Sequence, residues 1–250
     1  MMSGLTNELL KGGIIAGTSY QSSGHYYMGI NEGVNNVLGD AYSAPLSIES
    51  INFQIIEPYV NVEKPTADGL EFVGNYLNAH AKILERSGAN FIACASNTVH
   101  IVADKIMHDV NPPLLHIADA TAEDIERTGI GKVGLLGTGL TMREPFYKER
   151  LQKQSGVQVY VPRNESMDRL NEIIFEELCS GNVFSNSIQQ FESMIHEMVR
   201  DYGIQGVILG CTELNMLIKK KLSEYRIHIF DTTQIHINSI VKRILNGNIH

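Results

Sequence analysis

The sequence predicts an α/β fold of two pseudo-symmetric, doubly wound domains, each built on a central, mainly parallel sheet, with the active site in the cleft between them. Short apolar runs alternate with segments of helical periodicity along the 250 residues, and this alternation is typical of parallel strands covered by helices on both faces. The same order of elements, with Gly, Ser or Thr at the strand tips, occurs twice, which indicates an internal duplication. We expect one domain from residues 1–117 plus 221–250 and a second from residues 118–220.

The first half of the chain contains four expected strands, each followed by a helix. Thr66 is a plausible helix cap, and Gly88 is a typical residue at a helix end. The helix after the third strand has to stop before Pro112, because the residue before a proline avoids the helical conformation. We expect strands at 12–20, 43–53, 90–96 and 114–119, and helices at 25–39, 66–89, 97–110 and 120–129.

The second half repeats this alternation. Pro145 fits the first turn of a helix, where its missing N–H costs little. We expect the last strand and the last helix to return to the first half. The expected strands are 132–139, 157–162, 205–211 and 226–233, and the expected helices are 144–156, 167–182, 185–203, 212–225 and 234–247.

Composition and charge narrow the class of protein. Hydrophobic residues make up 43% of the chain, and a net charge of −8 argues against a nucleic-acid partner. No apolar run approaches the about 18 residues that a membrane span needs, and the first residues lack the pattern of a signal peptide. The three widely spaced cysteines indicate reduced thiols. We therefore expect a cytoplasmic protein with neither membrane nor nucleic-acid partners.

Two strand tips carry side chains suited to proton transfer and to carboxylate binding. Cys211 follows a strand where a helix begins, and a helix N-terminus favours the thiolate form, so this cysteine is a candidate nucleophile or base. The alternative is a buried structural cysteine. Ser96 ends the matching strand of the first half, followed by Asn97 and Thr98, whose donors and backbone N–H groups form a carboxylate cradle. The alternative there is a simple helix cap.

Two further groups of hydroxyls follow the other strands, and opposed tips of this kind suit removal of a proton from one face of a carbon acid and its return to the other. The hydroxyl groups are Thr18, Ser19, Ser22 and Ser23, then Thr138 and Thr141.

The chain has no complete dinucleotide fingerprint, no lysine in a Schiff-base setting and no convincing metal-binding histidine pair, so we expect neither cofactor nor metal. Four histidines are expected to be packing or surface residues. The histidines are His100, His116, His228 and His236.

Six stretches carry a resemblance that covers nearly the whole chain. They are GTSYQSSGHYYMGINEGV at 17–34, CASNTVH at 94–100, LHIADAT at 115–121, VGLLGTGLTM at 133–142, NEIIFEELCSGN at 171–182 and GVILGCTEL at 206–214. Together they resemble the aspartate/glutamate racemase superfamily, in particular its broad or L-preferring amino-acid racemase branch. This resemblance implies a site between two α/β domains, an amino-acid substrate that is aspartate or glutamate or a broader set, and a homodimer. It also implies cofactor-independent racemisation by two cysteines on opposite faces of the α-carbon.

The chain departs from the family pattern at one of these cysteines. The resemblance places the second cysteine at Cys211 and the first at Ser96. A serine hydroxyl titrates far above neutral pH, so it donates or relays a proton but is a poor free base. We therefore expect asymmetry, with Cys211 as the competent base toward one enantiomer, by family analogy the L form. Cys94 points the same way as Ser96 from deeper in the strand and is a less favoured substitute.

The resemblance also implies a substrate-binding set. Candidates for a distal carboxylate are Arg143 and Arg169, although some aspartate racemases place a lysine near the position of Cys179. Two other readings stay open, a decarboxylase or isomerase of the same superfamily that uses a single cysteine, and a binder of amino acids without catalysis. The expected carboxylate-binding residues are Ser19, Asn97, Thr98, Thr138, Thr141 and Thr212.

Overall fold

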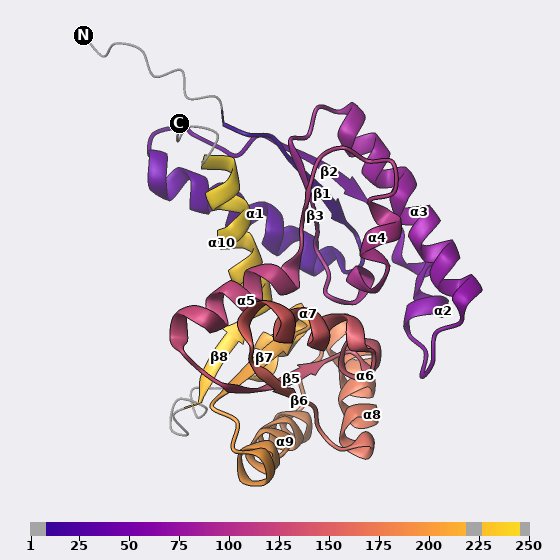
Figure 1. The fold of residues 1–250 in the computed structure, drawn as a ribbon, viewed down its shortest axis with the longest axis vertical. Coiled ribbons are helices and arrows are strands. Elements are labelled where there is room, and N and C mark those ends of the chain that lie inside the picture. The colour runs from indigo at the N-terminus through magenta and orange to yellow at the C-terminus, as the bar shows by residue number, and fades with distance from the viewer. Residues whose placement is uncertain (1–8, 219–226, 246–250) are drawn as a thin grey trace.

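The computed structural model describes residues 9–218 and 227–245, which form two four-stranded parallel sheets (Figure 1). The strand orders are β2-β1-β3-β4 and β6-β5-β7-β8, so the second sheet repeats the topology of the first. This confirms the expected α/β fold with two similar sheets. The strands are β1 (Gly12–Ala16), β2 (Leu46–Ser50), β3 (Phe91–Cys94), β4 (Leu114–Leu115), β5 (Lys132–Gly137), β6 (Gln158–Tyr160), β7 (Gly206–Gly210) and β8 (His228–Asp231).

Helices cover both faces of the first sheet, because apolar side chains leave each strand in both directions. Ile15 packs with α3 (Ala67–Arg86) and α4 (Ala103–Ile106) on one face, whereas Ile14 packs with α1 (Tyr20–Leu38) and α10 (Thr232–Leu245) on the other. As expected, α3 begins after Thr66, whose Oγ1 accepts a hydrogen bond from Gly69 N–H at 3.1 Å. The short α2 (Glu57–Val60) lies between β2 and α3.

The segment after β3 differs from the expected single helix. It forms a 3₁₀ turn at Thr98–Val102, followed by the short α4. The expected strand after Pro113 is only two residues long, because α5 (Ile117–Thr128) begins at once. The side chain of His116 starts that helix by accepting a hydrogen bond from Ala118 N–H through Nδ1 at 3.1 Å. Histidine is not among the common cap residues, so local sequence rules place this boundary too late.

The second sheet is covered by α5 and α7 (Pro145–Ser155) on one face and by α8 (Asn164–Glu172) and α9 (Ser185–Tyr202) on the other. The short α6 (Gly139–Arg143) follows β5, and Pro145 opens α7 as expected. The expected helix at 167–182 starts earlier and changes form, because α8 continues as a π-helix at Ile173–Glu177 and a 3₁₀ turn at Leu178–Ser180.

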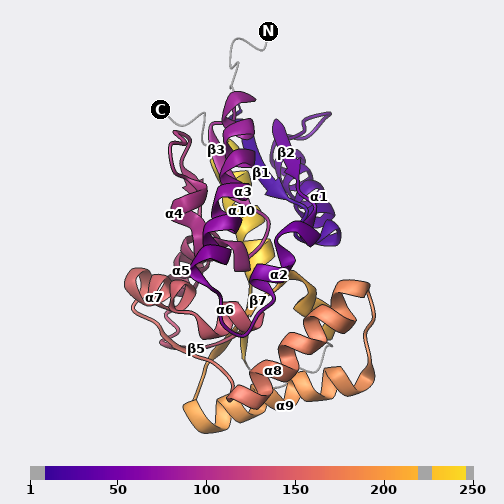
Figure 2. The same ribbon diagram turned by 90° about the vertical axis from the view of Figure 1, so that its right-hand side faces the viewer.

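The last strand lies in the second sheet, not in the first as expected. β8 pairs with β7 in parallel, from Gly206 with His228 to Leu209 with Asp231. The last helix does return, because α10 packs against both α1 and α5 and runs from the second sheet toward the first (Figures 1 and 2). Ile117 and Ala118 of α5 belong to the apolar core of the second sheet. The domain boundary near residue 117 stays a prediction. Parts of three expected elements, at residues 219–226 and 246–247, lie outside the described residues.

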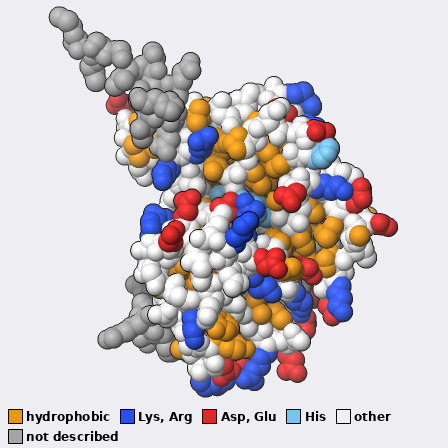
Figure 3. Space-filling view, in the orientation of Figure 1, with side chains coloured by type: hydrophobic (Ala, Val, Ile, Leu, Met, Phe, Trp, Pro, Cys, Tyr) orange, Lys and Arg blue, Asp and Glu red, His pale blue; other side chains and the backbone are white. Residues whose placement is uncertain are grey.

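The surface carries both signs of charge. On the face in Figure 3, acidic and basic side chains are intermixed and separated by apolar patches. In the described parts of the chain, no helix is both long enough and apolar enough to cross a membrane.

Candidate active site

The tips of the central strands of both sheets meet at one cavity. The strand order reverses between β1 and β3 in the first sheet and between β5 and β7 in the second, and in open α/β sheets ligands bind at such reversals. Ser96 follows β3 and Cys211 follows β7, and both side chains line this cavity. The cavity has about 540 Å³ of empty space, including its opening to solvent. The structure therefore brings together the two residues on which the expected chemistry depends.

The Cys211 thiol contacts a buried carboxylate. Cys211 caps a 3₁₀ turn at Thr212–Leu217, and its Sγ donates a hydrogen bond to Oε2 of Glu213 at 3.0 Å. The hydroxyl of Thr212 donates to the same oxygen. Burial, and then the charge of Glu213, raise the pKa of the Cys211 thiol well above its ordinary value. These two effects outweigh the lowering of the thiol pKa that a helix N-terminus was expected to cause.

Ser96 is half-buried and lines the same cavity. Its backbone carbonyl accepts a hydrogen bond from Nδ1 of His100 at 2.7 Å, which fixes the turn after β3. Next to it, Gly17 turns the chain after β1 with a φ of +95°. A Cβ at Gly17 would lie 2.2 Å from the carbonyl oxygen of Ile51, so only glycine fits this turn.

Three threonine hydroxyls join the two halves behind the cavity. Oγ1 of Thr98 lies 2.9 Å from Oγ1 of Thr138 and 3.3 Å from that of Thr141, and the last two are 3.0 Å apart. Thr98 and Thr138 line the cavity, whereas Thr141 is fully buried behind them. Thr141 therefore supports the site without facing it.

The remaining expected binding residues lie at the cavity wall. Ser19 caps α1, because its Oγ accepts a hydrogen bond from Ser22 N–H at 3.2 Å, and it lines the cavity together with Thr212. Asn97 also lines the cavity, but its amide nitrogen donates to Oγ1 of Thr232 at 3.0 Å. This bond uses one of the two N–H donors of the Asn97 amide and fixes the orientation of the side chain.

Other candidates lie away from the cavity. Cys94 is fully buried in the apolar core, and burial raises the pKa of its thiol to about 12, so it does not replace Ser96. Neither Arg143 nor Arg169 lines the cavity. Arg143 forms an ion pair with Asp168, and Arg169 forms ion pairs with two glutamates.

The sequence pointed to the position of Cys179 only through the lysine of some aspartate racemases, and it did not identify the apolar part of the lining. Cys179 lines the cavity, and burial raises the pKa of its thiol to about 12. Its position depends on the π-helix, which shifts the phase of the side chains and has no simple sequence signal. Four apolar side chains complete the wall, namely Phe53, Val60, Ile174 and Phe175. Within residues 9–218 and 227–245, no group of three or more His, Cys, Asp or Glu side chains is placed to hold a metal ion.

Comparison with known proteins assigns the family. Residues 15–240 match the Asp/Glu/Hydantoin racemase family. The chain belongs to this family. Two crystal structures are similar over nearly the whole chain. A candidate Asp/Glu racemase from Yersinia pestis is 36% identical, with a TM-score of 0.84 and coverage of 95% of this chain and 100% of that one. An aspartate racemase homologue from Pyrococcus horikoshii is 39% identical, with a TM-score of 0.77 and coverage of 94% and 98%.

A curated relative gives the same family assignment. A broad specificity amino-acid racemase from Bacillus subtilis is 27% identical over 65% of this chain and 68% of its own length. These matches confirm the expected family, and with it an enzyme of the amino-acid racemase class.

Proposed function

We propose that the protein racemises a free amino acid without a cofactor, by exchange of the α-proton between the two walls of the cavity. The observation that carries this proposal is that Cys211 and Ser96, at equivalent strand tips, line one cavity. We assign Cys211 as the base on one face and Ser96 as the proton donor on the other.

The hydroxyls and backbone N–H groups at the strand tips hold the substrate carboxylate. Cys211 has to lose its proton first, because only a thiolate removes a proton from carbon. The C–H bond then breaks, an S–H bond forms, and the electron pair passes into the carboxylate as an enolate. The hydroxyls of Ser19, Thr98 and Thr138 stabilise the developing charge. The proton that Cys211 first lost passes to solvent. Ser96 protonates the opposite face of the α-carbon and regains its proton from solvent, and Cys211, which now carries the former α-proton, is again the resting thiol.

The two faces of the cavity differ in how readily they remove the α-proton. A thiol, even with a raised pKa, is far more acidic than a serine hydroxyl, so the Cys211 face is the better face for proton removal. By analogy with the family, this face meets the α-hydrogen of L-amino acids. We expect fast α-proton exchange of the L form and slow α-proton exchange of the D form, and slow conversion of either enantiomer into the other.

Deuterium exchange tests this assignment. L- and D-amino acids are incubated in deuterated buffer, and label at the α-carbon and inversion are measured by NMR and chiral chromatography. We expect Cys211→Ala to lose exchange and Ser96→Cys to raise the conversion of the D form. Cys94→Ala, which removes a thiol outside the cavity, is the matched control. Unchanged exchange in Cys211→Ala, or no gain in Ser96→Cys, would contradict the assigned roles.

A second candidate is a decarboxylase or isomerase of the same superfamily. The replacement of the first cysteine by Ser96 favours it, because a single thiol is enough to protonate one face of a carbanion. Release of CO₂ from a substituted malonate, without α-proton exchange of any amino acid, would support this alternative. A protein that binds amino acids but exchanges no proton would be a binder. Formation of a homodimer and a cytoplasmic location stay predictions, tested by analytical ultracentrifugation and by cell fractionation.

A further inference from the structure

The cavity wall carries an unbalanced negative charge. Among the described residues that line it, Glu213 is the only charged side chain, and it is 8% exposed. In the same part of the chain, no lysine, arginine or histidine forms an ion pair with it. A buried carboxylate without a cation is costly, and a positively charged ligand would remove that cost.

Two buried acceptors in this wall have no donor. Both hydrogen bonds that Glu213 accepts reach Oε2, whereas Oε1 has no partner among the described residues. The same is true of Oδ1 of Asn97. The amide of Asn97 is oriented by Thr232, which donates its own proton to the carbonyl of Leu209 and therefore accepts from the Asn97 nitrogen. An unpaired buried acceptor costs about 1–3 kcal/mol, so both atoms indicate a ligand that supplies N–H donors.

We propose that Glu213, together with Asn97, binds the α-ammonium group of the substrate, and that the cavity prefers amino acids with a neutral side chain to those with a second carboxylate. This inference rests on the proposed function, because it assigns a role to the substrate of that reaction. An ammonium group offers three N–H donors and one positive charge, which matches the two unpaired acceptors and the carboxylate. Neither acceptor atom is exposed, so the two side chains turn toward the cavity when the ligand binds.

A second carboxylate has no positively charged partner among the described residues that line this cavity. The thiol of Cys179 lines the cavity within reach of the charge of Glu213. Other large side chains of the lining are apolar, among them Phe53, Val60, Ile174 and Phe175. The arginines that could have served a distal carboxylate are paired elsewhere on α6 and α8. A dicarboxylic amino acid would therefore add an uncompensated negative charge beside Glu213.

The same contact links substrate binding to the base. The charge of Glu213 helps to keep the Cys211 thiol protonated. An ammonium group paired with Glu213 offsets that charge, so the thiol is easier to deprotonate when the substrate is in place. The base is then formed mainly in the complex, and the free enzyme keeps an unreactive thiol.

Two pairs of ligands of matched shape test the proposal by calorimetry with the full chain. L-alanine and L-lactate differ in the ammonium group, and L-asparagine and L-aspartate differ in the charge of the side chain. We expect the wild type to bind L-alanine at least tenfold more tightly than L-lactate, and L-asparagine at least tenfold more tightly than L-aspartate. Equal binding of L-alanine and L-lactate, or tighter binding of L-aspartate, overturns the proposal.

Variants locate the effect. Glu213→Gln should reduce the preference for L-alanine over L-lactate at least tenfold, whereas Glu172→Gln, which changes an exposed glutamate on α8, should leave it unchanged. A preference that survives in a folded Glu213→Gln protein contradicts the role of Glu213. If this variant does not fold, the two wild-type comparisons still decide. Ammonium-dependent binding without deuterium exchange would refute the proposed function alone, and exchange without that dependence would refute only this inference.

Discussion

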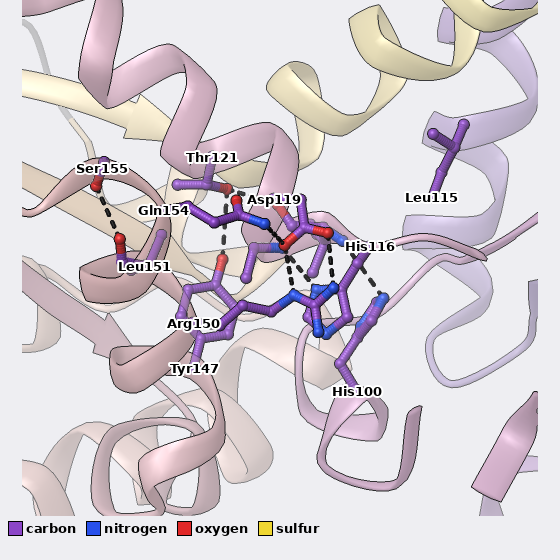
Figure 4. Close-up of polar contacts among 12 residues, drawn as sticks. His100, Leu115, His116, Asp119, Thr121, Tyr147, Arg150, Leu151, Gln154 and Ser155 are labelled. Carbon is purple, nitrogen blue, oxygen red and sulfur yellow. Dashed lines mark hydrogen bonds and ion pairs between the residues drawn. The ribbon is translucent and has the colours of Figure 1, made fainter. Parts of the chain in front are cut away.

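Acidification from pH 7 to pH 5 is expected to destabilise the fold through three buried histidines. His100, His116 and His236 are 2%, 4% and 0% exposed, and the rings of His100 and His116 lie 4.3 Å apart. Figure 4 shows these two rings side by side, next to Asp119 and Arg150. Burial lowers the pKa of His116 to about 3 and that of His236 to about 4, and it lowers the pKa of His100 well below the ordinary value. All three are therefore neutral in the folded protein.

Hydrogen bonds hold these rings in their neutral forms. Nε2 of His236 donates to the carbonyl of Leu115 at 2.9 Å, so Nδ1 accepts from the hydroxyl of Tyr26, also at 2.9 Å. Nδ1 of His116 accepts a backbone N–H, as does Nε2 of His100. If one of these accepting ring nitrogens took up a proton, two hydrogens would point at each other and the hydrogen bond would break. The rings therefore join the turn after β3 to α5 and α10 only while they are uncharged.

The sign and size of the effect follow from proton uptake. The unfolded histidines titrate near pH 6.5, above the folded values, so the unfolded state binds more protons below that pH. Their stabilising contribution is complete above about pH 6.5 and is lost as the pH falls toward 4. The slope for each histidine reaches about 1.4 kcal/mol per pH unit only well below pH 6.5, so each lowers the free energy of unfolding by about 2 kcal/mol between pH 7 and pH 5. The three together lower it by about 6 kcal/mol. That is a large part of the about 5–15 kcal/mol of a typical domain.

Urea unfolding at several pH values between 5 and 7 measures this slope. His116→Asn should reduce it by about a third, because asparagine also caps a helix but does not titrate. His108→Gln is the control, since this histidine is exposed. A free energy of unfolding that stays constant from pH 7 to pH 5, or an unchanged slope in His116→Asn, would refute the reasoning.

Three further predictions concern stability and are checked by urea unfolding at pH 7. Gly17→Ala should cost more than 3 kcal/mol, because its Cβ would overlap the backbone at Ile51, whereas Gly88→Ala, with a φ of +83° but open space, should cost only about 1 kcal/mol; equal losses would exclude the clash. Thr138→Val should cost about 1–3 kcal/mol by leaving buried hydroxyls without a partner, and Thr138→Ser should restore most of it. Phe191→Ala should cost about 3–5 kcal/mol, since this ring is fully buried in the core of the second sheet, and a loss below 1 kcal/mol would argue against that packing.

The sequence by itself determined the α/β class, the duplication and the strand tips that form the site. These features depend on local patterns, because apolar periodicity, the cap at Thr66 and the order of segments are all written within short stretches. Ser96 and Cys211 could be paired from the sequence because they follow equivalent strands of the two repeats and stand at the two cysteine positions of the resembling family.

The tertiary structure alone decided the sheet that receives β8, the start of α5 at His116 and the entry of Cys179 into the cavity wall. It also reversed the expected direction of the pKa shift at Cys211, because burial and the charge of Glu213 outweigh the helix N-terminus. These outcomes depend on which distant segments remove water from a group and which charges remain beside it. No local pattern encodes that desolvation, so it is fixed only when the two halves pack together.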